Sequence, residues 1–274
     1  MINNQTRLNL IIGYPLAHSK SPVLHNAVYK ELNCNAVMLA HATETLSETI
    51  NSLKTLDVGL TAVTMPYKKE ILPYLDNMSD EVKTLGAANT IICHQNKLTG
   101  YNTDVDGIAY ALRDVTLANK TVLVIGAGGA ANAAAYYLAK QNANILWLNR
   151  TQQHAVSIMQ TFGGKCVDAN HLNELQIDVI INTTPLGMYP DVEVSPLPNY
   201  KFNHHQIIFD MVYNPVQTLL IKQAKKAGAT CISGLDMFIG QGLRQIELWL
   251  NQSIDKLKLT DMIKIKLKEN EVTA

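Results

Sequence analysis

The sequence predicts an α/β protein of two domains, each built on an open and mainly parallel sheet. Apolar, strand-like runs alternate with helical spacing over residues 8–65, and a second alternating series begins at residue 120. Strand–helix–strand alternation favours right-handed crossovers between parallel strands. The chain has 274 residues, of which 47% are hydrophobic and 17% charged, enough for two globular domains.

In the first series, strands are expected at residues 8–13, 36–42 and 60–65, with helices from residue 22 and over 46–56. Pro22 suits a first helical position and Ser21 is placed to cap that helix. Residues 89–102 are expected to form a hairpin that turns at Gln95-Asn96-Lys97. His18 and His25 are interpreted as loop or packing residues.

The second series opens with a strand and an Ala-rich helix within residues 120–140. Its other strands are expected at 144–148, 178–182, 206–211 and 230–232, and its other helices at 152–162 and 216–227. The residues from Asp236 onward are expected to be helical.

Charge and cysteine content narrow the function classes. The 23 basic and 23 acidic side chains balance, which gives no electrostatic case for nucleic acid or a membrane surface. The first sixteen residues carry one Arg and a five-residue apolar run, too little for a signal peptide. The four scattered cysteines are read as reduced thiols. We therefore expect a soluble, cytoplasmic protein without a structural metal.

A glycine-rich loop opens the second series. "VLVIGAGGAA" places Gly126, Gly128 and Ala131 at the positions of a G-x-G-x-x-A fingerprint, between a strand and a helix. The first glycine permits a tight turn, the second lets a pyrophosphate approach, and the alanine allows close helix–strand packing. The helix N-terminus adds N–H groups and a positive dipole end. This context predicts a Rossmann-type dinucleotide-binding domain.

The end of the next strand indicates which dinucleotide binds. Domains that bind NAD place an acidic residue there for the ribose 2′-hydroxyl. Here the segment reads Asn149-Arg150-Thr151, without a carboxylate. An arginine can hold a 2′-phosphate with two hydrogen bonds, which favours NADP; the alternative is a solvated arginine at a helix start.

Two loops of the first series are expected at the same sheet edge, because ligands bind beyond the carboxyl ends of parallel strands. Ser19 and Ser21 precede a helix N-terminus, which favours an anion such as a carboxylate, although Ser21 alone could be a plain cap. Lys68 is expected just inside a helix N-terminus, where a cation is disfavoured unless a carboxylate or ligand compensates. Asp104 and Asn89 are candidates that capping or turn chemistry could also explain.

The motifs taken together resemble the shikimate dehydrogenase family along the whole chain. They run from "HSKSP" through "VTMPYK", "GAANT" and "GYNTD" to "GAGGA", "NRT", "DMVY" and "GLDMFIGQ". The resemblance implies NADPH-dependent reduction of 3-dehydroshikimate to shikimate, in aromatic amino acid and chorismate biosynthesis. It also implies a discontinuous substrate domain (1–103 and 236–274), an NADP domain (104–235) and an active-site cleft between them. The partner would be a small molecule, and a homodimer is allowed.

Matching motif by motif, the resemblance assigns Lys68 and Asp104 to catalysis. The residues it implies for substrate binding are Ser19, Ser21, Thr64, Lys68, Asn89, Asp104, Tyr213 and Gln241. Those it implies for the cofactor are Gly126, Ala127, Gly128, Gly129, Ala130, Asn149, Arg150, Thr151, Met211 and Gly234.

Two positions depart from the family pattern. Ala62 stands where the family usually has Asn, and Gln153 and His154 stand where a second basic residue often follows the cofactor arginine. One polar contact to substrate and part of the 2′-phosphate clamp are therefore in question.

Three alternatives remain. A quinate/shikimate dehydrogenase would use NAD or NADP and accept quinate. A non-catalytic NADP sensor would keep the fold without turnover, although intact Lys68 and Asp104 argue against it. Methylenetetrahydrofolate dehydrogenase shares the two-domain plan and a lysine but lacks "HSKSP" and "GYNTD".

Overall fold

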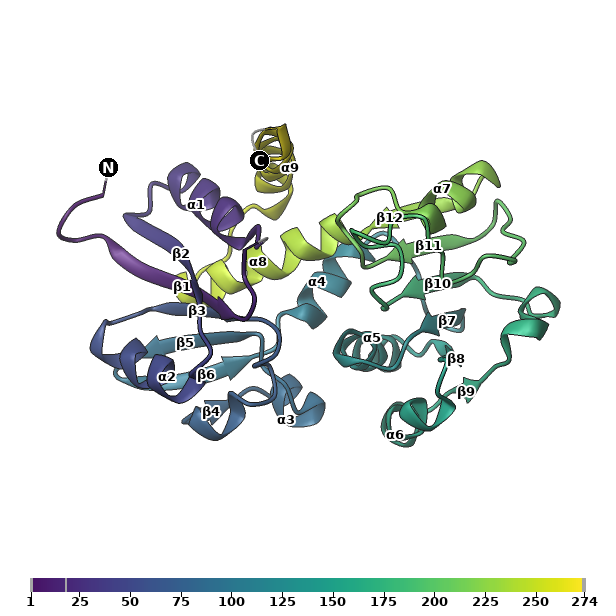
Figure 1. Ribbon diagram of the computed structural model, residues 1–274, viewed down its shortest axis with the longest axis horizontal. Coiled ribbons are helices and arrows are strands. Elements are labelled where there is room, and N and C mark those ends of the chain that lie inside the picture. Colours follow the sequence, from purple (N-terminus) through teal and green to yellow (C-terminus); the bar gives the residue numbers. More distant parts are fainter. Residues whose placement is uncertain (1, 18, 273–274) are drawn as a thin grey trace. The chain divides into compact units, whose positions relative to one another are not determined.

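The computed structural model describes residues 2–17 and 19–272; His18, for which a loop or packing role was expected, lies outside them. The chain divides into two compact units, Met1–Asp106 with Ile239–Ala274 and Gly107–Phe238 (Figure 1). Their boundaries fall three residues beyond those expected from the sequence. Two helices, α4 (Asp104–Ala111) and α8 (Gly234–Leu250), continue across these boundaries.

The first unit contains a six-stranded sheet in the order β2-β1-β3-β5-β6-β4. Its strands are β1 (Arg7–Gly13), β2 (Ala36–Ala42), β3 (Leu60–Val63), β4 (Asn77–Met78), β5 (Thr90–His94) and β6 (Lys97–Tyr101). β1 pairs in parallel with β2 and β3, whereas β5 runs antiparallel to β3 and to β6. The expected hairpin is confirmed, and Gln95 and Asn96 form its turn with positive φ.

Alternation along β1 directs side chains to two packed faces. Leu10 and Ile12 join a core formed with α2 (Leu46–Thr55). Asn9, on the opposite face, bonds Tyr29 of α1 (Ser21–Glu31), and the Tyr29 ring packs against Trp249 of α8. Both faces are therefore covered by helices, with α9 (Lys256–Val272) against α1.

Two expectations about local structure near the site are wrong. The N-cap of α1 is Lys20, so Ser21 is the first helical residue, and the Ser21 N–H points to Ser19 Oγ at 3.4 Å. Lys68 lies in consecutive turns over residues 65–71, not in a helix, followed by the 3₁₀ segment η1 (Leu72–Tyr74). The short helices α3 (Asp80–Leu85) and α4 were not predicted.

The second unit contains a parallel six-stranded sheet in the order β12-β11-β10-β7-β8-β9. Its strands are β7 (Thr121–Ile125), β8 (Asn144–Leu148), β9 (Lys165–Cys166), β10 (Val179–Asn182), β11 (Ile207–Asp210) and β12 (Thr230–Ser233). The order reverses direction between β7 and β10, which is the doubly wound arrangement of dinucleotide-binding sheets.

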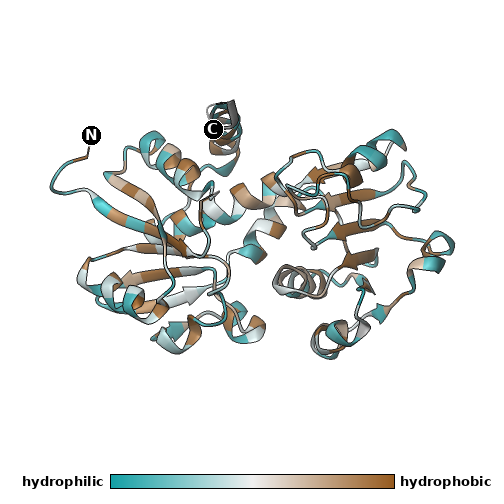
Figure 2. Ribbon diagram, viewed as in Figure 1, coloured by the Kyte–Doolittle hydropathy of each residue, from teal (hydrophilic) through white to brown (hydrophobic). Residues whose placement is uncertain are grey.

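Helices of this unit are α5 (Gly129–Lys140), α6 (Gln152–Phe162) and α7 (Leu219–Lys226), with the 3₁₀ segment η2 (Ala169–Glu174). One core joins Leu123, Ile180 and Ile208 of the strands to Leu220 and Ile221 of α7. Figure 2 shows the strands of this sheet among the most hydrophobic segments of the chain. Such continuous apolar runs are typical of parallel strands buried on both faces.

No helix of the described residues is long and apolar enough to cross a lipid bilayer.

Candidate active site and dinucleotide loop

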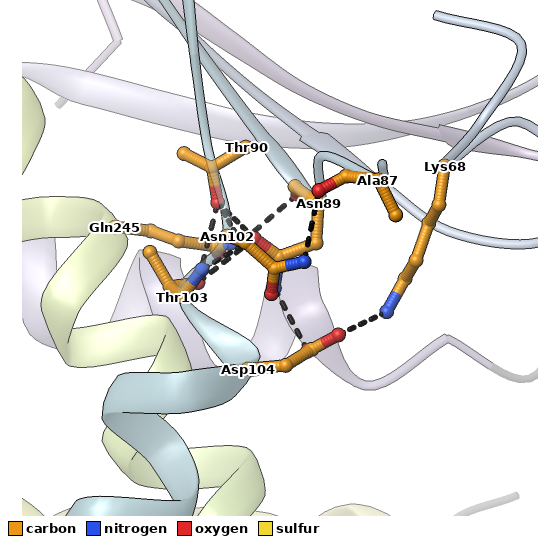
Figure 3. A network of polar contacts seen from close by, with 8 residues as sticks. All are labelled: Lys68, Ala87, Asn89, Thr90, Asn102, Thr103, Asp104 and Gln245. Atoms are coloured by element: carbon orange, nitrogen blue, oxygen red, sulfur yellow. Dashed lines mark hydrogen bonds and ion pairs between the residues drawn. The ribbon is translucent and has the colours of Figure 1, made fainter. Parts of the chain in front are cut away.

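The turn after β3 positions Lys68. Its backbone is tied in place by tertiary contacts, because the Ala88 N–H donates to the Lys68 carbonyl at 2.8 Å. The neighbouring Tyr67 is buried and donates its hydroxyl to the Thr43 carbonyl at 2.6 Å. The Lys68 backbone is thus anchored on both sides while its side chain extends from the turn (Figure 3).

Asp104 begins α4, where a carboxylate is favoured by the helix dipole. Its Oδ2 lies 2.6 Å from Lys68 Nζ, and the two side chains are 16% and 32% exposed. Asp106, in the same turn, instead forms an ion pair with Arg244 at 3.4 Å, and burial is the main cause that raises its pKa. The structure therefore selects Asp104 as the partner of Lys68.

Asn89 holds the second oxygen of that carboxylate. Its Nδ2 donates to Asp104 Oδ1 at 2.8 Å (Figure 3). Its Oδ1 accepts from Thr90 Oγ1 at 2.8 Å, from Thr103 N at 2.8 Å and from Thr103 Oγ1 at 3.1 Å. With the amide oxygen surrounded by donors, the amide nitrogen is left to face Asp104.

The polar network around Asn89 contains residues that sequence reasoning did not select. Thr90 begins β5 and Thr103 follows β6, with their hydroxyls 3.2 Å apart, and Gln245 of α8 donates to Thr90 Oγ1. Asn102 donates to the Ala87 carbonyl at 2.9 Å and fixes the loop before Asn89. Hydroxyl and amide residues of this kind give no periodic signal, so only the fold brings them together.

The other expected substrate residues of the first unit lie just before and at the start of α1, directly after β3, and within α8. Ser21 is buried at the start of α1, and Ser19 is half-buried just before it. Thr64 follows β3 directly and donates its N–H to the Ile12 carbonyl at 3.0 Å. Gln241 is half-buried in α8. The structure does not test the roles expected for these four residues.

The glycine-rich loop of the second unit has the geometry expected for a dinucleotide site. Gly126 has a φ of +109°, and a Cβ at this position would lie 2.6 Å from Thr183 Oγ1. Gly128 is the N-cap of α5, and nothing lies within 4 Å of a Cβ built on it or on Gly129. Ala127 and Ala130 are half-buried in the same loop. Exposed backbone at a helix N-terminus suits a phosphate group.

The end of β8 also fits NADP. Arg150 is exposed, and its side chain makes no ion pair or hydrogen bond with another described residue. Asn149 Nδ2 donates to the Thr151 carbonyl at 2.7 Å, which shapes the turn before α6. An exposed guanidinium at this turn suits a phosphate, and the turn carries no competing carboxylate.

Three further expected residues cluster in the second unit. A Cβ on Gly234 would collide with the Met211 carbonyl, so the start of α8 and the segment after β11 can pack this closely only because of the glycine. Tyr213 stacks on Phe238 with ring centroids 4.9 Å apart, and burial raises the pKa of its phenol. The proposed contacts of these residues with cofactor or substrate stay predictions.

Substitutions at the two glycines of the loop are expected to have different effects. Gly126→Ala should lower the free energy of unfolding by about 1–2 kcal/mol through its left-handed backbone alone, with the Thr183 contact adding to it. Gly128→Ala should cost less than about 1 kcal/mol but weaken dinucleotide binding, because its methyl group occupies space at the helix N-terminus. Urea unfolding measures the free energy of unfolding, and fluorescence titration with NADPH measures dinucleotide binding. Equal stability losses would contradict the loop geometry.

Comparisons with known proteins extend along nearly the whole chain. Residues 11–91 match the shikimate dehydrogenase substrate binding domain, and residues 109–189 match shikimate / quinate 5-dehydrogenase. A shikimate dehydrogenase (NADP(+)) of Shouchella clausii (strain KSM-K16) is 37% identical over 273 residues, or 96% of this chain and 99% of the relative. A crystal structure of shikimate dehydrogenase in complex with NADP+ superposes with a TM-score of 0.89, at 36% identity over 97% of each chain. The shikimate 5-dehydrogenase of Thermus thermophilus, in complex with NADP(H) and shikimate, gives a TM-score of 0.87 at 29% identity, covering 95% of this chain and 100% of that one.

Proposed function

The chain belongs to the shikimate dehydrogenase family, and we infer that it catalyses the reversible, NADP-dependent conversion of shikimate to 3-dehydroshikimate. The observation that carries this inference is the Lys68–Asp104 pair, held by Asn89 in a chain that matches the family over nearly its whole length. It is an oxidoreductase acting on a CH–OH group, in the route to chorismate and the aromatic amino acids.

The lysine and aspartate divide the proton chemistry. When bound, NADP supplies the acceptor or donor of the hydride. Ketone reduction leaves negative charge on oxygen, which needs a proton donor within hydrogen-bonding reach. A lysine ammonium only donates hydrogen bonds and a carboxylate only accepts them. The pair therefore offers both a donor and an acceptor, so it can serve ketone reduction and the reverse oxidation. The Lys68 side chain keeps 32% exposure, which lets it exchange protons with water.

Substrate orientation is assigned to polar side chains that the family resemblance selects. Asp104 and Asn89 would hold ring hydroxyls, with Thr64 and Gln241. Ser19 and Ser21 would bind the substrate carboxylate, supported by the position of Ser19 just before α1 and of Ser21 as its first residue. The carboxylate contact of Tyr213 stays a prediction from the family resemblance. Holding these groups keeps the reacting carbon in one orientation. Such positioning lowers the activation barrier.

Initial rates at 340 nm with two substrates and two cofactors test this function. Shikimate with NADP+ should give the highest kcat/KM of the four combinations. Comparable rates with quinate would support the alternative of a quinate/shikimate dehydrogenase, and comparable rates with NAD+ would support its dual cofactor use. A folded protein that binds NADPH but shows no turnover with any combination would overturn the proposal in favour of a sensor.

Cofactor choice should depend on Arg150. Arg150→Ala removes a charge-assisted hydrogen bond to the 2′-phosphate and should weaken NADP+ binding by about 1.5–3 kcal/mol. NAD+ lacks that phosphate and serves as the internal control, since its affinity should barely change. Isothermal titration with both cofactors measures the difference. Equal losses for NADP+ and NAD+ would show that Arg150 acts on another part of the cofactor.

We also propose that the protein acts in the cytoplasm, where its biosynthetic substrate and NADPH are available. The homodimer that the family resemblance allows stays a prediction, and light scattering on the purified protein measures it.

A further inference from the structure

Gln245 is a buried amide that the proposed chemistry leaves without a role. It lies on α8 with 1% of its surface exposed. Its Nε2 donates to Thr90 Oγ1 at 2.9 Å and points to the Asn89 carbonyl at 3.4 Å. Both acceptors belong to the segment that carries Asn89, 155 and 156 residues earlier in the chain (Figure 3).

The direction of the hydrogen bonds links Gln245 to the reacting pair. Because Thr90 Oγ1 accepts from Gln245, its own proton is free to go to Asn89 Oδ1 at 2.8 Å. That bond helps to hold the Asn89 amide with its oxygen inward and its nitrogen on Asp104 Oδ1. Asp104 Oδ2 in turn holds Lys68. Aligned hydrogen bonds of this kind polarise and strengthen one another.

The sheet itself does not supply this donor. Ala62 of β3 is the direct cross-strand partner of Thr90, so their side chains share one face of the sheet. Ala62 is buried and carries no polar atom in its side chain. The amide that satisfies Thr90 therefore enters from α8.

The amide oxygen of Gln245, Oε1, is buried and makes no hydrogen bond of ordinary geometry with the described residues. The side chain does lie near His25, and its effect there raises the pKa of that imidazole. An apolar side chain of similar size would avoid the cost of burying this oxygen, so the amide needs an explanation. The donor side of the amide provides one.

We propose that Gln245 is a positioning residue of the reaction, acting through Thr90 and Asn89 to align Asp104 and Lys68. This inference rests on the proposed dehydrogenase activity and adds to it a residue that does not touch the substrate. It predicts an effect on the chemical step and none on cofactor binding.

The test compares Gln245→Met, which keeps the side-chain volume but removes both donors, with Gln252→Met, at an exposed position just after α8, as the matched control. Gln245→Met should lower kcat for shikimate oxidation about tenfold or more, since small misplacements of reacting groups are costly. KM for shikimate should change less than kcat, and the NADP+ dissociation constant should stay at its wild-type value. Gln252→Met should match wild type throughout.

Thr90→Val completes a double-mutant cycle. If Gln245 acts through Thr90, the double variant should lose no more kcat than the larger single loss. An additive loss, an unchanged kcat in Gln245→Met, or an effect confined to KM would overturn the proposal. Gln245→Ala takes the same place in the cycle if Gln245→Met does not fold. An inactive wild-type protein would instead refute the dehydrogenase activity itself, so the two failures are distinguishable.

Discussion

Lys68→Ala is expected to lower kcat for shikimate oxidation by about 10²–10⁴-fold, the range for a lost general acid–base group. The reason is the geometry of the pair: Lys68 Nζ lies 2.6 Å from Asp104 Oδ2, and Asn89 holds the other carboxylate oxygen. Removing the side chain leaves the reacting oxygen without its acid–base group and Asp104 without its cation. Steady-state kinetics with saturating shikimate and NADP+ measure the loss.

Lys69→Ala is the matched control. Lys69 is the next residue of the same turn, and it is exposed. Its removal should change kcat less than about twofold, because surface charges contribute little. NADP+ affinity should survive in both variants, because the lysines belong to the first unit and the glycine-rich loop to the second. Similar kcat losses in the two variants, or no loss in Lys68→Ala, would refute the role assigned to Lys68.

Acid should destabilise the protein through His25. This side chain is fully buried in α1, with Nδ1 2.8 Å from the Ser21 carbonyl. Burial lowers its pKa to about 4, against the smaller raising effects of the Ser21 carbonyl and the Gln245 side chain. The folded state therefore resists protonation that the unfolded state accepts below about pH 6.5. Stability present above that pH is lost as the pH falls towards 4.

At about 1.4 kcal/mol per pKa unit, the His25 contribution amounts to about 3 kcal/mol between pH 7 and pH 4. Urea unfolding at pH 7, 5.5 and 4 should show a smaller acid loss in His25→Gln than in wild type, by roughly that amount. His94→Gln, at an exposed histidine, should keep the wild-type pH dependence. If His25→Gln loses stability with pH as steeply as wild type, another group is responsible.

The strands and the glycine loop could be predicted because their signals are local. The runs at 36–42 and 144–148 end at turn residues and match β2 and β8 residue for residue. The loop from Gly126 to Ala131 has the strand before it and the helix after it that its fingerprint requires.

The turn around Lys68 could not be predicted in the same way. A helix was expected after Pro66, but Tyr67 and Lys68 are held by Thr43 and Ala88, which are distant in sequence. These tertiary contacts override the local preference. The same holds for α4, eight residues long with little periodicity, although its first residue, Asp104, was a candidate from its motif.

Ser21 and Gln245 illustrate two further limits. Ser21 is a residue type that favours a helix N-cap, and the helix was expected to begin at Pro22. It begins one residue earlier, so Ser21 is its first residue. Gln245 lies in an amphipathic helix whose pattern predicts a packing face, and nothing local indicates that its amide meets Thr90. Side-chain pairs so distant in sequence are set by topology.

The most direct test of hydride transfer from the shikimate ring uses shikimate deuterated at carbon 3, incubated with the wild-type protein and NADP+. Mass spectrometry of the cofactor should show one deuterium in each NADPH formed, with 3-dehydroshikimate produced in equal amount. NADPH without deuterium, or a folded protein that forms none, would contradict the account.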